Sequence, residues 1–549
     1  MLRDVIRTAR HRLSVPARGW QRLVLLAAVA LIVAACVSGD QAEDRILDRG
    51  LGQEPESMDP HLARTTQAHT VQRDLFEGLV SYSADGELVP GAAQRWDISG
   101  DGLEYVFHLR EDARWSNGDA LVAGDFLFSL RRLVDPATAA FYAESLSAIV
   151  NAPQIVAGDA APDTLGVEAP DDRTLVIRLS RNLPYFLDLL THPSAFPIHP
   201  ASFRQYGGQF SRPGNLVSNG AYRLDDWTLG ASIELRRNEQ YWNAGATAIE
   251  RVRYHMIQDP SVELNRYRAG ELDTTSSVPT ESFAAVRRQF ANQLRIAPAL
   301  SVYFYGINLS HEALGGNPEL RQALSMAIDR ETLVEQVIGR GEAPAYSFVP
   351  PGVNNYAAPQ LPFASLDENE RHAEARRLFE AAGYGPGRLP ELELRYNTSE
   401  THRRIAVAIQ EMWHDVLGFE VRLINEEFRA LVANIQAREI TQLFRLSWNG
   451  DYNDAHSFLT LFESDNPSNM FGYSNPDFDR LMQQAAEQTD LDHRRLFLEE
   501  AERELLSDHV VIPLYFPVSK HLVSPRVGGW QDNILDYHYS QHLYFTGID

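Results

Sequence analysis

Short runs of alternating apolar and polar residues are interleaved with amphipathic stretches along almost the whole chain. Residues 103–109 and 391–396 alternate as strands with one buried face do. Between 320 and 328, apolar residues recur every three or four positions, which is typical of a helix with one apolar face. The proline-rich stretch 340–368 is predicted to be either a surface loop or a loop lining a cleft. The pattern predicts α/β or α+β layers, and 549 residues allow about two to four domains.

The first 36 residues have the pattern of a secretory signal. Residues 1–22 carry six arginines and one aspartate, and residues 23–35 form an apolar run of 13 residues without charge. At about 1.5 Å per residue this run reaches about 20 Å, which is short of a hydrocarbon core of about 30 Å. The sequence therefore predicts a cleaved signal peptide, with an uncleaved membrane anchor as the alternative.

Cys36 is the single cysteine of the chain and directly follows Val33-Ala34-Ala35. This ending resembles a bacterial lipobox, which implies that Cys36 is lipidated and becomes the first residue of the mature protein. A chance cysteine beside a signal-peptidase site is the alternative. A lone cysteine also excludes an internal disulfide framework and a cysteine-rich zinc site.

Acidic side chains outnumber basic ones by 74 to 50, which gives a formal net charge of -24. Nucleic acid is therefore not expected as a partner, because phosphate binding needs a basic face. Lys520 is the only lysine, and it lies outside any Gly-rich phosphate-binding motif, so a P-loop is excluded.

Motifs of common enzyme classes are absent from the sequence. There is no Gly-x-Ser-x-Gly, no His-Glu-x-x-His and no Gly-x-Gly-x-x-Gly that opens a helix. His538 and His542 are four residues apart, but the aromatic-rich stretch 536–545 is predicted to be a strand. We therefore expect these histidines to be surface polar residues rather than metal ligands. The sequence predicts no catalytic residue, no metal and no cofactor.

Six short sequence blocks follow one another in a characteristic order from about residue 50 onward. They are residues 54–61, 73–79, 109–118, 219–222, 265–272 and 448–453. In order and spacing they resemble the extracytoplasmic oligopeptide-binding proteins of bacterial ABC importers. The resemblance implies a solute-binding component with short peptides and a permease–ATPase complex as its partners.

The resemblance implies a large three-lobed periplasmic-binding-protein fold, in which two α/β lobes joined by a hinge carry an inserted lobe. By position, lobe I comprises residues 44–76, 200–300 and 519–549, lobe II is the insertion 77–199, and lobe III is 301–518. In this family the ligand lies between lobes I and III, which close around it by hinge motion. The expected protein is a monomer on the periplasmic or extracytoplasmic side, held there by a lipid anchor.

The implied ligand site centres on the segment Trp448-Asn449-Gly450-Asp451. All peptides share a backbone, an ammonium group and a carboxylate, and a buried ammonium needs a fixed carboxylate partner. The resemblance gives this role to Asp451, with turn capping as the alternative. It places Arg445 in the cleft near the ligand or Asp451, with a strand-edge arginine as the alternative. Trp448 is expected to be either a flat wall for the ligand or a core residue.

Other positions match family residues around the side-chain pockets. The aromatic matches, for which a core position is the alternative, are Tyr142, Phe304 and Phe428. Arg438 is the nearest match to an arginine that meets the carboxylate of shorter peptides. Where the family has two acidic residues that favour basic peptide side chains, this chain has Arg64 and Gly306. A preference for lysine-rich peptides is therefore not expected.

Two other functions remain open at this point. The same fold could bind a different solute, such as a cell-wall peptide, an opine, a sugar or a metal chelate, because fold does not fix function. A secreted hydrolase that uses a carboxylate pair is supported only by the abundance of aspartate and glutamate.

Overall fold

The structure, a computed structural model, describes residues 45–547 of the chain. The predicted signal segment and the predicted lipidation site at Cys36 lie outside these residues. Within residues 45–547, none of the helices combines the length and the apolar character that crossing a bilayer requires. The predicted alternation of strands and helices runs through this whole part of the chain and builds several sheets.

Sheet A is formed by the residue ranges predicted for lobe I. Its strand order is β1-β10-β9-β8, and β8, β9 and β10 are an antiparallel meander. The strands are β1 (Ile46–Gly50), β8 (Tyr222–Thr228), β9 (Ser232–Arg237) and β10 (Arg251–His255). The helices of these ranges are α2 (Thr66–Leu75), α6 (Pro200–Tyr206), α7 (Pro260–Arg268) and α8 (Phe283–Gln289). Thr65 begins α2 as an N-cap, since its side chain accepts the N–H of Ala68.

Sheet B lies within residues 77–199, the predicted insertion. Its order is β4-β5-β7-β6, with antiparallel neighbours. The strands are β4 (Ala93–Ile98), β5 (Glu104–Leu109), β6 (Val167–Glu168) and β7 (Thr174–Arg178), and a hairpin of β2 (Val80–Tyr82) and β3 (Leu88–Pro90) precedes them. The helices are α3 (Ala123–Val134), α4 (Ala152–Val156) and α5 (Phe186–Leu189). Every second residue of β5 is buried, as the alternation over 103–109 predicts, and Phe107 packs in one core with Trp115 and Phe126.

Sheet C has six strands in the order β13-β17-β12-β16-β14-β15. They are β12 (Ser301–Ile307), β13 (Ala343–Pro344), β14 (Glu393–Asn397), β15 (Arg422–Glu426), β16 (Leu443–Asn449) and β17 (Val511–Phe516). β14 runs parallel to β15 and β16, whereas β12 is antiparallel to β16 and β17. The predicted strand 391–396 corresponds to β14.

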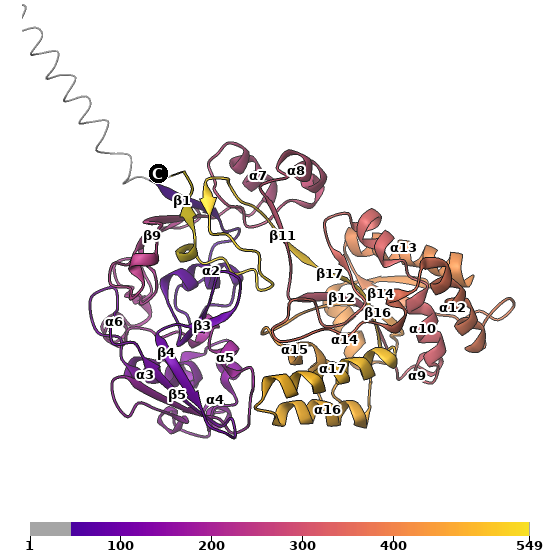
Figure 1. Ribbon diagram of the computed structural model, residues 1–549, viewed down its shortest axis with the longest axis horizontal. Coiled ribbons are helices and arrows are strands. Elements are labelled where there is room, and N and C mark those ends of the chain that lie inside the picture. Colours follow the sequence, from indigo (N-terminus) through magenta and orange to yellow (C-terminus); the bar gives the residue numbers. More distant parts are fainter. Residues whose placement is uncertain (1–44, 548–549) are drawn as a thin grey trace, which may run out of the picture. The chain divides into compact units, whose positions relative to one another are not determined.

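Helices cover both faces of sheet C (Figure 1). One face packs against α10 (Pro318–Met326), α12 (Glu368–Ala381) and α13 (Glu400–Leu417), the other against α14 (Phe428–Ala437), α16 (Pro476–Glu487) and α17 (Leu491–Ser507). Neighbouring residues of β16 divide between the two cores, because Leu443 faces the α10 side and Phe444 the α17 side. The predicted helix over 320–328 is α10. The expected α/β class is thus confirmed.

A two-stranded ribbon connects sheet C with the lobe I ranges (Figure 1). β11 (Leu294–Pro298) pairs antiparallel with β18 (Val518–Leu522). β11 leads directly into β12, and β17 leads through Pro517 into β18. Two strands are the kind of connection that a hinge uses. The lobe boundaries themselves stay a prediction, which the distribution of the sheets supports.

The proline-rich stretch 340–368 is packed onto the core rather than lying loosely on the surface. Phe348 and Val349 are fully buried beside the α17 side of sheet C. Their backbone N–H groups donate to Oε1 of Glu502 on α17 at 2.7 and 2.9 Å, and the hydroxyl of Tyr356 donates to Oε2 at 2.5 Å. Glu502 is therefore the polar anchor of this segment.

Glu502 should make stability depend on pH in a defined window. Burial raises the pKa of Glu502 from 4.5 to about 7. Because the folded pKa lies above the unfolded one, this contribution, about 3 kcal/mol, is complete below about pH 4.5 and is lost as pH rises through about 7. Glu502→Gln, which mimics the protonated acid, should lack this dependence, so the melting temperature of the parent should fall relative to the variant between pH 4.5 and 7.5.

Thermal unfolding across this pH range tests the prediction. Glu500→Gln changes an exposed residue of the same helix and is the control, for which a constant difference from the parent is expected. Parallel curves for the parent and Glu502→Gln would contradict the assignment.

Candidate ligand-binding site

A cavity of about 520 Å³ collects residues from distant parts of the chain. Its wall includes Tyr142 and Asp188 from the predicted insertion, Gly450 and Asp451 from the segment after β16, and Tyr537 near the C-terminus. Its volume falls in the range of about 300–1,000 Å³ that is common for small-molecule sites. We refer to it as the Asp451 cavity.

The end of β16 holds Asp451 in place through backbone and indole hydrogen bonds. The N–H of Gly450 donates to the carbonyl of Leu300 at 2.8 Å, and the N–H of Asp451 donates to Oγ of Ser457 at 2.8 Å. Nε1 of Trp448 donates to the carbonyl of Ser457 at 2.8 Å. The segment is thus fixed from both sides before any ligand arrives.

A buried ion pair ties the same segment to α17. Arg494 donates to both carboxylate oxygens of Asp454, at 2.6 and 2.9 Å, and the N–H of His456 donates to Asp454 at 2.8 Å. Burial alone would raise the pKa of Asp454, but Arg494 outweighs it and holds that pKa below its usual value. Asp454 is therefore ionised and structural.

Asp451 differs from Asp454 because its carboxylate has no partner. Among the described residues, neither a hydrogen bond nor an ion pair reaches its side-chain oxygens, and burial raises its pKa. Asp188 is another acid on the cavity wall. It accepts a hydrogen bond from the hydroxyl of Tyr82 at 2.8 Å, and burial raises its pKa to about 7. Glu144, Arg73 and Arg181 also line the cavity, so its wall presents groups of both signs of charge, as a ligand with an ammonium group and a carboxylate would require.

Aromatic rings line much of the remaining wall. Tyr185 and Tyr452 stack in parallel, with ring centroids 4.0 Å apart and an interplanar angle of 8°. The ring of His192 lies 4.4 Å from that of Tyr142. Burial lowers the pKa of His192 well below its usual value, so its imidazole is neutral at pH 7. The walls therefore offer flat, uncharged surfaces to side chains.

The structure brings only some of the sequence-predicted residues to this cavity. Asp451, Gly450 and Tyr142 lie on its wall. Asn449 is exposed at the end of β16, and Trp448 is half-buried against the core of sheet C.

Arg445 lies further back on β16 and forms no ion pair with Asp451 within the described chain. Its Nη1 donates to Oδ1 of Asn397 at 3.1 Å, and its guanidinium lies over the ring of Tyr303 at 4.5 Å. Burial and the charge of Arg445 lower the pKa of His402, on α13, to about 4. Arg445, Tyr303 and His402 thus form one cationic–aromatic cluster.

Three other predicted site residues do not line this cavity. Phe304 is 1% exposed and packs edge-on against Phe348 in the core. Phe428 is 52% exposed at the start of α14, outside the cavity wall. Arg438 ends α14 as its C-cap in the left-handed conformation, with φ of 58°. A match by position places a residue in the fold, but it does not say which way the side chain points.

Two other sequence positions have packing roles in the structure. A Cβ at Gly306 would lie 2.2 Å from the ring of Phe444, so close packing of β12 against β16 requires glycine there. Arg64 lies over the ring of Phe141 at 5.1 Å. Neither restores an acidic group to the site.

The prediction of a strand over 536–545 is wrong for most of that stretch. Asp536 has a positive φ of 56°, residues Ser540–His542 form a short 3-10 helix, and only Tyr544–Phe545 is extended. His538 contacts Asp536 at 3.1 Å, whereas Nε2 of His542 lies 3.4 Å from the carbonyl of Tyr82. The two histidines therefore do not share a site.

Several cavity residues carry no recognisable sequence signal. Asp188 and Tyr185 lie in or beside a four-residue helix within the predicted insertion, and Tyr537 follows an irregular segment. Their role depends on chain segments more than 100 residues away, which no local pattern encodes. Tyr452, next to Asp451, could have been inferred from its neighbour.

Comparison with known proteins adds independent findings. The model of the family described as "Bacterial extracellular solute-binding proteins, family 5 Middle" matches residues 87–470. The chain is 36% identical over 525 residues to the periplasmic oligopeptide-binding protein OppA of Salmonella typhimurium, covering 95% of this chain and 96% of OppA.

Two solved structures resemble the chain over almost its whole length. The unliganded open form of the periplasmic murein tripeptide-binding protein MppA gives a TM-score of 0.88 at 36% identity, covering 92% of this chain and 98% of MppA. Haemophilus influenzae OppA in complex with RPPGFSPFR gives a TM-score of 0.67 at 34% identity, covering 92% of this chain and 100% of that OppA. At nearly equal identity, the fit to the open form is the better one.

The sheets, the connecting ribbon and the cavity define a solute-binding protein of the multi-lobed α/β class. The chain belongs to family 5 of the bacterial extracellular solute-binding proteins.

Gly450 should be intolerant of a side chain. A Cβ there would lie 2.8 Å from Leu300 and 2.9 Å from Phe458, so Gly450→Ala should lower the free energy of unfolding by about 1–3 kcal/mol. Gly316→Ala is the control, because a Cβ there meets nothing within 4 Å. Denaturant unfolding compares both variants with the parent, and equal stability of the two variants would disprove the packing constraint.

Proposed function

We propose that the chain is the solute-binding component of an ABC importer, which captures short peptides outside the cytoplasmic membrane and delivers them to a permease. The observation that carries this proposal is the carboxylate of Asp451, which has no partner among the described residues and lies on the wall of a cavity with several aromatic side chains. The relatives named as peptide-binding proteins support it. We place the protein there as a monomer, held by a lipid on Cys36 and performing no catalysis.

Asp451 would pair with the ammonium group of the peptide. Desolvation disfavours the charged form of the carboxylate, and an ammonium partner stabilises that form. The carboxylate in turn compensates the buried charge of the ammonium group. The anchoring of its segment through Asp454 and Arg494 means that no loop ordering has to accompany binding. Stacked rings such as Tyr185 and Tyr452 would contact side chains without demanding a particular sequence.

Arg445 would attract the carboxylate of the peptide. It precedes Asp451 by six residues, or about 20 Å of extended chain. Its Nε has no hydrogen-bond partner within the described chain, and no acidic side chain there neutralises its guanidinium. Closure about the ribbon of β11 and β18 would bring the lobes together around a peptide lying between the two charges.

A cell-wall peptide is the second candidate ligand. Asp188 and Glu144 add further carboxyl groups to the cavity, which suits a peptide whose diamino acid carries an extra ammonium group. The similarity to a murein tripeptide-binding protein points the same way. Calorimetric titration with a murein tripeptide and with trialanine distinguishes a cell-wall peptide from a general short peptide as the ligand. Tighter binding of trialanine would rule out the cell-wall peptide.

Asp451→Asn should weaken the binding of peptides with a free amino terminus at least tenfold, or by about 1.4 kcal/mol, because the buried ammonium loses its charged partner. Calorimetry with trialanine and acetyl-trialanine measures this after co-purified ligand has been removed by mild unfolding and refolding. The parent should discriminate strongly between the two peptides and the variant should not.

Asp492→Asn, at an exposed position of α17, is the matched control and should bind as the parent does. Equal affinity of the parent for the free and the acetylated peptide would remove Asp451 from this role.

Arg445→Gln should weaken the binding of peptides with a free carboxyl terminus several-fold. It should leave the binding of the corresponding C-terminal amides unchanged, because only the carboxylate needs the guanidinium. Arg438→Gln, an exposed arginine of the same part of the chain, is the control. The ratio of the two dissociation constants, acid over amide, is the measurement. A changed ratio in Arg438→Gln alone would transfer the role to Arg438.

A further inference from the structure

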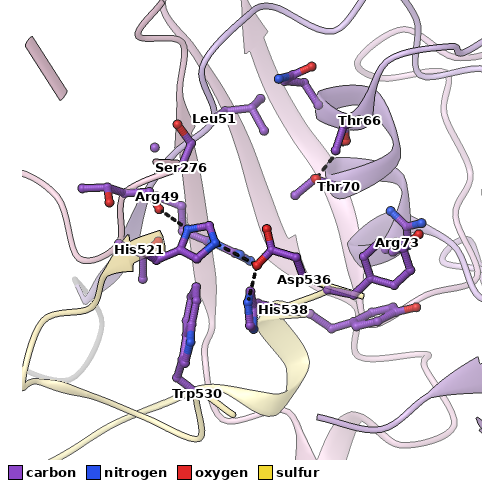
Figure 2. Close-up of a pocket in the computed structure, with 16 residues that line it drawn as sticks. Arg49, Leu51, Thr66, Thr70, Arg73, Ser276, His521, Trp530, Asp536 and His538 are labelled. Atoms are coloured by element: carbon purple, nitrogen blue, oxygen red, sulfur yellow. Dashed lines mark hydrogen bonds and ion pairs between the residues drawn. The ribbon is translucent and has the colours of Figure 1, made fainter. Parts of the chain in front are cut away.

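A second cavity, of about 130 Å³, lies beside the ribbon and contains a cluster of two histidines and an aspartate. His521 belongs to β18, whereas Asp536 and His538 belong to the segment that follows it (Figure 2). One potential ligand atom of each residue lies within 4.8 Å of those of the other two. This cluster takes no part in the peptide site described above.

The hydrogen bonds around His521 define how its ring is protonated. Nδ1 of His521 lies 2.9 Å from the carbonyl oxygen of Thr275, which can only accept, so Nδ1 carries a hydrogen. Nε2 then faces Oδ1 of Asp536 at 2.8 Å, and Nε2 of His538 faces the same oxygen at 3.1 Å. Two imidazole nitrogens thus converge on one carboxylate oxygen (Figure 2).

We propose that His521, Asp536 and His538 bind a divalent first-row transition-metal ion such as Zn²⁺. Tetrahedral bonds of about 2.0–2.1 Å place neighbouring ligand atoms about 3.3 Å apart. The separations of 2.8 and 3.1 Å to Asp536 need to widen by only a few tenths of an ångström. The contact of His521 with Thr275 is the second-sphere bond that orients a metal-binding imidazole.

Neighbouring groups hold this ligand set in position. The ring of Trp530 stacks on His538 with centroids 3.7 Å apart, and Oδ1 of Asp536 already contacts both histidines, at 2.8 and 3.1 Å. The adjoining cavity has room for a water molecule as fourth ligand. The ion would cross-link β18 to the C-terminal segment.

The charge around the cavity selects the kind of ion. Arg49 also lines it and is held by Tyr254 and Ser540 at 3.0 and 2.7 Å. A cation bound by charge alone is disfavoured beside a guanidinium, whereas imidazole coordination suits Zn²⁺, Ni²⁺ and Cu²⁺. Mg²⁺ and Ca²⁺, which prefer oxygen ligands, are not expected to bind.

Calorimetric titration of the mature protein with Zn²⁺ tests the proposal. We expect one site, a rise in melting temperature with Zn²⁺ but not with Mg²⁺, and at least tenfold weaker binding in His538→Gln. His414→Gln is the matched control, because Glu411, His414 and Asp415 form an exposed cluster on α13 that could take up metal adventitiously. Loss of the site in His414→Gln instead would mean an adventitious ion only.

A measurement on the parent keeps the test independent of variant folding. Co²⁺ bound by two imidazoles and a carboxylate in four-coordinate geometry should give intense visible absorption bands, and Zn²⁺ should displace it. The proposal would be overturned by the absence of these bands, by the absence of Zn²⁺ binding, or by unchanged Zn²⁺ binding in both His538→Gln and Asp536→Asn. The three residues would then form a hydrogen-bond network without a metal. Peptide binding is not part of any readout, so failure here does not bear on the proposed transport function.

Discussion

The bidentate ion pair between Asp454 and Arg494 is the interaction on which the geometry of the ligand site depends. It joins Arg494, a buried arginine of α17, to Asp454 and so fastens the segment after β16 to that helix. Asp451, three residues earlier, has no ion-pair partner among the described residues and lies on the cavity wall. Desolvation raises the pKa of Asp451 and so destabilises its ionised form in the protein without ligand. A ligand with an ammonium group would stabilise that ionised form.

The ribbon of β11 and β18 joins two regions with different chemistry. On one side, sheet C ends in the segment that carries Asp451. On the other, His521 of β18 meets Asp536 and His538. Arg73 and Tyr537, stacked at 3.6 Å, line both cavities, so the cluster beside the ribbon and the Asp451 cavity share a wall.

Periodicity was a good guide where one face of an element is buried against one neighbour. It located α10 and β14 to within two residues, because regular burial leaves a regular pattern. It failed around His538, where each aromatic or histidine side chain has a different partner, such as Trp530 for His538. The site shows the same division. The Asp451 segment could be identified from a compact motif, but Asp188 could not, because its place on the wall depends on how α5 packs near a distant segment.

The sequence by itself determined the α/β class, the family resemblance and the segment that carries Asp451, since these rest on periodic burial and on short contiguous motifs. The tertiary structure alone decided that Phe304 is core, that Arg438 caps a helix and that Asp188 joins the cavity. It also decided that His521 meets a segment 15 residues further along. Such pairings arise from the packing of whole elements, and the direction of a side chain follows from that packing and not from its place in the chain.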